Sequence, residues 1–236
     1  MTDAIILNAL EATWPAARSW RVGPWTVRQG LGGGQRVSAA TLDGDPGTGD
    51  RALAEAAMQD LGQASLFMVR DGEAALDAEL PASGYRMHDP VVIYAAPCAV
   101  LTAPEPNALT GFPHWPPLAI AIDIWAEGGI GPTRLAVMDR VAGPKTALLG
   151  RLGDRPAGVG FVGVQGAIAV LHALDVSRRC RRQGAGQALL RHAALWAAAQ
   201  GADQLILAVT AANGPARAMY NRLGLKPVGQ YHYRVL

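Results

Sequence analysis

The sequence is poor in cysteine, in net charge and in long apolar runs, and each shortage excludes a class of protein. Its two cysteines, Cys98 and Cys180, belong to no C-x-x-C pair or other metal-ligand spacing, so neither a disulfide framework nor a zinc site follows. The formal net charge of +2 gives no general reason to expect nucleic acid or an anionic membrane as a partner. The longest apolar stretch, residues 91–102, is too short to span a bilayer.

The beginning of the chain also lacks the basic region of a signal peptide, since the acidic Asp3 precedes its first apolar run. We therefore expect a cytoplasmic protein. Hydrophobic residues, by contrast, make up 50% of the 236 residues, and charged residues 17%. This composition is typical of a globular protein with a sizeable core, and the length fits one large or two modest domains.

Two segments rich in turn-forming residues divide the chain. Residues 42–50 read LDGDPGTGD, as expected of a surface loop, and residues 102–117 contain five prolines. We predict an N-terminal domain over residues 1–101, a proline-rich linker over 102–117 and a C-terminal domain over 118–236. Strand-like and helix-like segments alternate in both halves, which predicts an α/β or α+β fold.

The C-terminal half has the clearest secondary-structure signals. Residues 184–200 carry apolar side chains at i, i+3 and i+4 spacing, which predicts a helix. Residues 205–209 form the continuous apolar run of a central strand, and Pro215 fits the first turn of another helix. We also predict strands at residues 118–124 and 230–236.

The loop that leads into the 184–200 helix has the composition of an anion-binding site. Gly184 and Gly186 let a backbone approach a ligand closely, while free N–H groups and the macrodipole at a helix start favour negative charge. The segment is neither a Walker A motif nor a G-x-G-x-x-G dinucleotide fingerprint. A diphosphate would fit here.

Two motifs in this region resemble those of the GNAT family of N-acetyltransferases. The first is R-x-x-G-x-G, at Arg181, Gly184 and Gly186. The second is N-x-x-A-x-x-x-Y-x-x-x-G-F, which begins at Asn213 and includes Tyr220, with leucine in place of the usual phenylalanine. Two such motifs at the right separation are much more specific than either motif alone.

The resemblance covers about residues 146–236, and it implies a mixed sheet whose fourth and fifth strands splay apart to admit the pantetheine arm of acetyl-coenzyme A (acetyl-CoA). Tyr220 would face the thioester sulfur and give a proton to the leaving thiolate. By position, the cosubstrate would be contacted by a strand end, by the loop around its diphosphate and by two side chains further on. In chain order these are Leu174, Asp175, Val176, Arg181, Arg182, Gln183, Gly184, Ala185, Gly186, Gln187, Asn213 and Tyr220.

A base is needed as well, because a free alkylamine with a pKa of about 10.4 is almost wholly protonated at neutral pH. His172 is the first candidate, since it interrupts the apolar alternation of residues 168–176 on the strand that reaches the cosubstrate. A hydrogen-bonded structural histidine explains this position equally well. Asp175 is a second candidate, and a polar residue at a strand end is the simpler interpretation of it.

The N-terminal half has no such loop. Its glycine run, residues 30–34, stands between two strand-like segments and no helix follows it, so we interpret it as a hairpin. Residues 80–96 weakly resemble residues 219–235 in the order helix, glycine, strand. We therefore expect a degenerate, non-catalytic repeat of the acetyltransferase fold, which would cover the acceptor end of the active site as in tandem members of the family.

These features predict an acetyl-CoA-dependent N-acetyltransferase that acts by direct attack of an amine, through a tetrahedral intermediate and without a metal. Strand-end N–H groups would stabilise the oxyanion. We expect acetyl-CoA and an amine acceptor as partners, no nucleic acid and no membrane, in a monomer or homodimer. Two alternatives stay open: a non-catalytic sensor or scaffold that binds acetyl-CoA, and a nucleic-acid binder that uses the arginine-rich residues 178–182.

Overall fold

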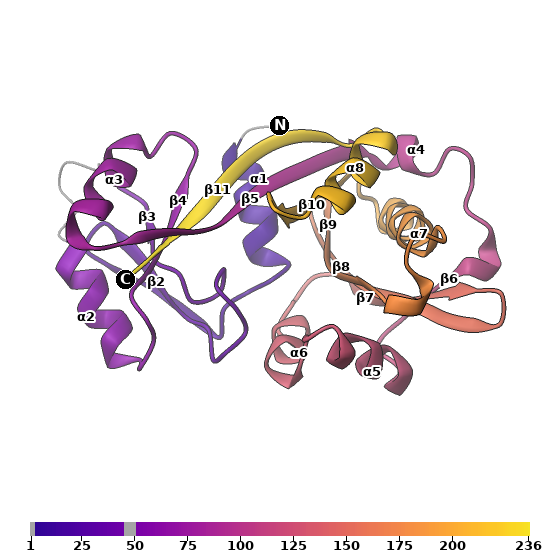
Figure 1. Ribbon diagram of the computed structural model, residues 1–236, viewed down its shortest axis with the longest axis horizontal. Helices are drawn as coiled ribbons and strands as arrows, with labels where there is room; N and C mark the ends of the chain where they lie inside the picture. The colour runs from indigo at the N-terminus through magenta and orange to yellow at the C-terminus, as the bar shows by residue number, and fades with distance from the viewer. Residues whose placement is uncertain (1–2, 45–50) are drawn as a thin grey trace.

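The computed structural model describes residues 3–44 and 51–236, and most of its strands belong to one mixed sheet (Figure 1). In sheet order these strands are β4 (Leu66–Arg70), β11 (Lys226–Val235), β5 (Arg86–Pro97), β10 (Gln204–Thr210), β9 (Ile168–Val176), β8 (Arg155–Gln165), β7 (Lys145–Leu152) and β6 (Gly111–His114). β9 and β10 are parallel, and the other neighbours are antiparallel. The predicted α/β fold with a mixed central sheet is confirmed.

A smaller sheet contains β1 (Arg18–Val22), β2 (Trp25–Gln29) and β3 (Thr41–Leu42), and a parallel bridge between Ala40 and Phe67 connects it to β4. The helices in chain order are α1 (Asp3–Ala12), α2 (Arg51–Asp60), α3 (Ala74–Glu79), α4 (Cys98–Leu101), α5 (Ala119–Glu127), α6 (Pro132–Asp139), α7 (Ala185–Ala199) and α8 (Gly214–Arg222). Short 3-10 turns lie at Leu80–Ser83, Ala108–Thr110 and Arg178–Cys180. In the described part of the chain, no helix is long and apolar enough to cross a membrane.

Helices cover both faces of the large sheet. On one face, α7 and α8 pack against alternate residues of the central strands, such as Leu171 of β9 and Leu207 of β10. On the other face, α1 packs against the intervening residues of the same strands, such as Val170 of β9 and Ile206 of β10. On that face α5 and α6 cover β7 and β8. Because β10 is buried from both sides, it has the continuous apolar run that predicted a strand at residues 205–209.

Most of the predicted elements of the C-terminal half are present, but one is wrong. The predicted 184–200 helix is α7, the helix expected around Pro215 is α8, and β11 includes most of the terminal strand. Residues 118–124 are predicted as a strand, but Leu118 caps helix α5 and the other residues belong to that helix. The buried residues of α5, Ala121, Ile124 and Trp125, follow helical spacing, but all of residues 118–124 except Asp123 are apolar, which hides that period.

The hairpin interpretation of the glycine run is also wrong. β2 pairs with β1 and β3, and the segment after Gly34 forms turns instead of a strand. The run lies against helix α6, where a Cβ atom on Gly33 would come within 2.5 Å of Val137 Cγ2. Gly32 has a φ of +77° and would place a Cβ atom 3.2 Å from Thr133. These glycines allow a close approach of backbone to helix.

The predicted linker, residues 102–117, includes β6 and does not separate two sheets. β5, which precedes it, lies between β10 and β11, which both follow it (Figure 1). β5 pairs with β10 from Pro97 to Val91, and β11 pairs with both β5 and β4. The strand ladder of the large sheet therefore contains segments from both predicted domains, while the division into domains stays a prediction.

Candidate active site

The parallel strands β9 and β10 separate at one end of the sheet. Their ladder ends at the pair Leu171 and Leu207, although β9 continues to Val176 and β10 to Thr210. β8 still pairs with β9 as far as Val176, so only the edge toward β10 is open. This is the splay expected of the fourth and fifth strands. Backbone groups at such an open edge can bond to an extended ligand.

A bulge in β9 lies beside this gap. Ala173 has a φ of +49°, in the left-handed region, and the register with β8 shifts so that Ala173 and Leu174 both stand opposite Gly160. The indole Nε1 of Trp125, on α5, donates a hydrogen bond of 2.8 Å to the carbonyl of Ala173. Bulges of this kind often re-aim backbone groups next to active sites.

The loop after β9 leads to the start of α7 through two left-handed residues, Arg182 with a φ of +59° and Gly184 with a φ of +91°. The helix begins at Ala185, so the N–H groups of its first turn have no partner within the helix. A Cβ atom on Gly184 would meet nothing within 4 Å, which means that the space in front of this backbone is open. This backbone geometry is compatible with an anion site, and the binding of an anion here stays a prediction.

Some side chains of this region bond within the protein. Arg181 Nε donates to the carbonyl of Val176 at 3.0 Å, and its guanidinium lies 3.8 Å from a carboxylate oxygen of Asp175. Gln183 Nε2 donates to the carbonyl of Arg179 at 2.8 Å. These contacts tie the exposed loop to the end of β9, and they give Asp175 a cationic neighbour.

Asn213 caps the helix that carries the second motif. Its Oδ1 accepts a hydrogen bond of 3.2 Å from the N–H of Ala216, which satisfies one of the free donors at the start of α8. The side-chain oxygen therefore has a structural partner, and the amide NH₂ group is left to donate to a ligand.

Tyr220, on α8, is buried and packs against Tyr94, with 5.7 Å between ring centroids. Burial raises the pKa of Tyr220 to about 12, so its hydroxyl keeps its proton at neutral pH. Among the described residues, no partner forms a hydrogen bond with this hydroxyl. The side chain lines the cavity described below, and its role as a proton donor stays a prediction.

His172 is buried and hydrogen-bonded through both ring nitrogens. Thr13 Oγ1 donates to the carbonyl of Ala9 at 2.6 Å, so it accepts from His172 Nε2 at 2.8 Å. Nδ1 then accepts from the guanidinium of Arg36 at 3.4 Å. Burial, with the charge of Arg36, holds the pKa of His172 well below its usual value. This is the geometry of a neutral structural histidine, and the role of base stays a prediction.

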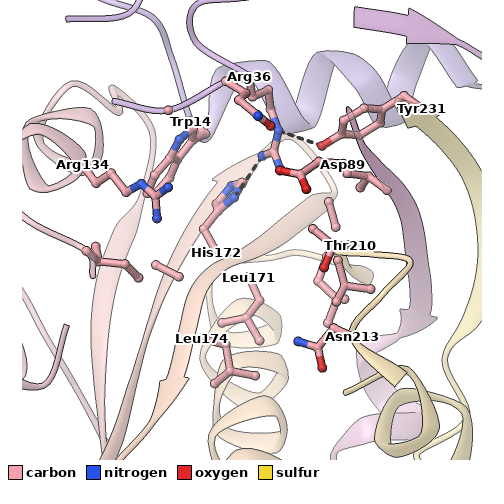
Figure 2. A pocket seen from close by; sticks show the side chains of 18 of the residues that line it. Trp14, Arg36, Asp89, Arg134, Leu171, His172, Leu174, Thr210, Asn213 and Tyr231 are labelled. Atoms are coloured by element: carbon pink, nitrogen blue, oxygen red, sulfur yellow. Dashed lines mark hydrogen bonds between the residues drawn. The ribbon is translucent and has the colours of Figure 1, made fainter. Parts of the chain in front are cut away.

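A cavity of about 450 Å³ joins the gap to residues from the first half of the chain (Figure 2). Four of the predicted site residues line it: His172, Leu174, Asn213 and Tyr220. The predicted residues 175, 176 and 181–187 lie outside it, further along β9 and around the start of α7. The arrangement can hold a long ligand whose anionic end lies at the loop and whose other end reaches the cavity.

Several cavity residues carry no local sequence signal, among them Trp14, Arg36, Asp89, Arg134 and Tyr231 (Figure 2). They come from different segments that meet only in the folded chain. Arg36 Nε donates to the hydroxyl of Tyr231 at 3.2 Å. Burial alone lowers the pKa of Arg36, but the neighbouring tyrosines more than offset this and raise it, so the residue carries a full positive charge.

The splayed parallel strands, the bulge and the glycine loop at a helix start define the acetyltransferase fold of the GNAT type. Residues 124–225 match the model of the acetyltransferase (GNAT) family. The chain is 26% identical over 234 residues to an uncharacterized N-acetyltransferase, YobR, of Bacillus subtilis (strain 168); the match covers 95% of this chain and 94% of the relative.

Two solved structures share the fold over most of the chain. A GCN5-related N-acetyltransferase from Kribbella flavida matches with a TM-score of 0.74 and 20% identity, covering 98% of this chain and 94% of that one. A tandem GNAT protein from the clavulanic acid biosynthesis pathway matches with a TM-score of 0.61 and 15% identity, and the match covers 94% of this chain and 84% of that one. With the family match and the curated relative, these findings support the GNAT family of acetyltransferases.

Proposed function

We propose that the protein is an N-acetyltransferase that moves an acetyl group from acetyl-CoA to an amine. The observation that carries the proposal is the gap between β9 and β10, which opens onto the cavity lined by Tyr220 and lies next to the glycine loop at the start of α7. The family match and the curated N-acetyltransferase relative support the same activity.

In this proposal the cosubstrate lies along β9. Backbone groups of residues 174–176 bond to the pantetheine arm, in the manner of strand addition. The loop of residues 181–187 surrounds the diphosphate, where the helix start, the left-handed Gly184 and the neighbouring arginines favour negative charge. Asn213 donates to the arm through its side-chain NH₂ group, since its oxygen caps α8.

The chemistry is direct acyl transfer. The amine nitrogen attacks the thioester carbon, and N–H groups at the bulge near Leu174 stabilise the oxyanion of the tetrahedral intermediate. The carbon–sulfur bond then breaks, and Tyr220 gives its proton to the departing thiolate. The burial that raises the pKa of Tyr220 to about 12 also disfavours a bare thiolate beside it, which strengthens the need for that proton.

The amine proton has to leave as well, and we propose His172 as its acceptor, directly or through a water molecule. His172 is neutral, as a base must be, because burial lowers its pKa. To accept a proton, Nδ1 would have to exchange its hydrogen bond from Arg36 for the acceptor amine or for water. The low pKa makes His172 a weak base, so solvent that enters through the cavity can share this task.

We further propose that the first half is a degenerate repeat without a cosubstrate site. β1 to β3, α2, β4, α3 and β5 repeat the order of β7 to β9, α7, β10, α8 and β11. The parallel bridge between Ala40 and Phe67 corresponds to the parallel pair β9 and β10. The similar tandem GNAT structure supports this assignment. The first half has no R-x-x-G-x-G motif.

Calorimetry and a thiol-release assay test the proposal together. Acetyl-CoA should bind with a stoichiometry of one per chain, and free CoA should appear when the right amine is added. Undetectable binding at millimolar acetyl-CoA, with the protein folded, would overturn the cosubstrate assignment. Binding without turnover across a broad amine panel would instead favour the sensor or scaffold. A second equivalent bound per chain would contradict the degenerate repeat.

A further inference from the structure

The cavity has a cationic part that the transfer chemistry above does not use. Arg36 reaches it from the turn after the glycine run, and Arg134 reaches it from α6 (Figure 2). A Cβ atom on Gly34 would lie 3.7 Å from Arg134 Nε, so this arginine packs against the same turn that carries Arg36. The close packing of the glycine run on α6 therefore brings two guanidinium groups to one cavity.

These two arginines differ from other arginines of the chain in their partners. Arg28 pairs with Glu11 at 2.9 Å and Arg234 with Asp77 at 2.8 Å. Within the described residues, no carboxylate forms an ion pair with Arg36 or Arg134. The hydrogen-bond partners of Arg36 include the Tyr231 hydroxyl and the His172 ring, and neither of them is a carboxylate.

The guanidinium group of Arg36 is costly without a counter-charge, because it is partly buried and neutral partners only partly replace its hydration; Arg134 is exposed and adds a second positive charge without that cost. An anion in the cavity would supply that charge, and a planar carboxylate or a phosphate suits the geometry of a guanidinium. His172 does not compete for the anion, since its low pKa keeps it neutral.

The other charged group of the cavity is Asp89, which lies on the Arg36 side in Figure 2 but forms no ion pair with Arg36. Asp89 precedes Val91, which pairs with Thr210 at the end of β10, and its carboxylate lies 3.4 Å from His88. The cavity therefore contains two guanidinium groups and one carboxylate, which can bind the anionic end and the amine end of one ligand.

We propose that the acceptor is a small amine that also carries an anionic group, a carboxylate or a phosphate, and that Arg36 and Arg134 bind this group. The amine end then points to the gap between β9 and β10. The cavity volume of about 450 Å³ is within the usual range for a small molecule. The inference rests on the proposed acetyl transfer and specifies the substrate class of that site.

Acceptors in matched pairs test the inference, with kcat/KM from the thiol-release assay. One arm compares amino acids with their carboxamides, and the other compares phosphoethanolamine with ethanolamine. The arm with the larger ratio of kcat/KM between the anionic and the neutral member identifies the anion. In at least one arm the anionic member should be favoured by about tenfold or more. Arg36→Gln should remove most of that preference, and the result is the ratio of kcat/KM for the two members, because Arg36 also contacts His172 and its loss can change the rate with both.

Arg134→Gln gives the same test without a folding risk, because Arg134 is exposed on α6. Arg155→Gln, an exposed arginine at the start of β8 and outside the cavity, is the matched control and should keep the preference. Equal or better turnover of the neutral members, or an equal loss for both members in the two cavity variants, would overturn the inference.

A binding measurement separates this inference from the proposed activity. The CoA-saturated protein is titrated by calorimetry with the same acids and amides, in the wild type and in Arg134→Gln. If no amine in any arm is acetylated although acetyl-CoA binds, the proposed transfer fails. Arginine-dependent binding of the acids would still support an anion site in that case, and binding that is absent or independent of Arg134 would refute it.

Discussion

At the scale of single residues, the two tyrosines Tyr94 and Tyr220 show how the surroundings of a side chain decide its role. Their rings are in contact, but the hydroxyl of Tyr94 accepts a hydrogen bond from Arg217 at 3.3 Å, whereas Tyr220 lines the cavity and its hydroxyl has no hydrogen-bond partner among the described residues. An aromatic residue in the middle of an amphipathic helix is usually only part of the core. The free hydroxyl at a cavity distinguishes Tyr220 from that ordinary case.

Tyr220→Phe should therefore remove the proton donor and preserve the packing of the ring. We expect near-normal affinity for acetyl-CoA and a kcat that is lower by roughly 10², the usual size of a lost general acid. Tyr94→Phe is the matched control, because it removes a neighbouring hydroxyl outside the cavity, and it should retain most of kcat. Full kcat in Tyr220→Phe, under conditions where chemistry limits the rate, would mean that the hydroxyl is structural.

The depressed pKa of His172 predicts a pH dependence of stability. The unfolded chain takes up a proton near pH 6.5 and the folded chain does so only at lower pH, so the stability associated with this group is complete above pH 6.5 and falls as the pH drops below it. The slope of the free energy of unfolding against pH approaches about 1.4 kcal/mol per pH unit for one proton. Measured by urea unfolding between pH 6.5 and 5, this free energy should fall less steeply in His172→Gln than in the wild type. Parallel curves for the two proteins would show that folding does not lower the pKa of His172.

The sequence could identify the residues of the site that belong to contiguous motifs, such as Gly184, Asn213 and Tyr220. Each of them follows from a local requirement: a left-handed turn, a helix cap and a fixed helix position. Arg36 and Arg134 could not be identified in this way, because they line one cavity only after the glycine run packs against α6. Their relation is tertiary, and no spacing in the sequence encodes it.

At the scale of elements, the C-terminal end of β9 and the N-terminal end of α7 act together. The strand supplies an open edge, and the helix supplies the free N–H groups of its first turn. The side chain of Arg181 holds the intervening loop to Val176. Helix α7 was predictable from the sequence because its apolar residues recur at i, i+3 and i+4 spacing and polar residues stand between them. Helix α5 was not, because nearly all of its residues are apolar and a strand or a helix of that composition looks the same.

Gly184→Val tests the loop at this scale. The left-handed φ of +91° is strained for a β-branched residue, so the backbone should move away from the position that cradles the diphosphate. We expect the Kd for acetyl-CoA, measured by calorimetry, to rise by more than about tenfold. Gly201→Val is the matched control: Gly201 has a φ of +86° just beyond the other end of α7, and a Cβ atom there also meets nothing within 4 Å.

The two variants should lose similar amounts of thermal stability, because they introduce the same backbone strain at the two ends of one helix. Only Gly184→Val should lose affinity for acetyl-CoA. Equal affinities in the two variants would show that the loop does not hold the diphosphate.

At the scale of the whole molecule, the position of β5 makes the two halves of the chain dependent on each other. β5 lies between β10 and β11, and its side chains enter both layers of the core: Tyr94 and Ala96 pack beneath α7, and Ile93 and Ala95 pack on the other face. The domain boundary predicted from the sequence assigns β5 to the N-terminal domain, residues 1–101. Strand order depends on long-range pairing, which local composition does not reveal.

The C-terminal half should accordingly be unable to fold by itself, although it contains both family motifs. Residues 102–236 without β5 would leave the edges of β10 and β11 unpaired and would expose apolar residues on both faces of the sheet. We expect this fragment to show no cooperative thermal transition by circular dichroism and no binding of acetyl-CoA. Residues 86–236, which restore β5, should regain part of the ordered structure, and the full chain should unfold in one transition. A cooperative fold and acetyl-CoA binding in residues 102–236 alone would show that the C-terminal half is an independent domain and that β5 only adds to a sheet that is already stable.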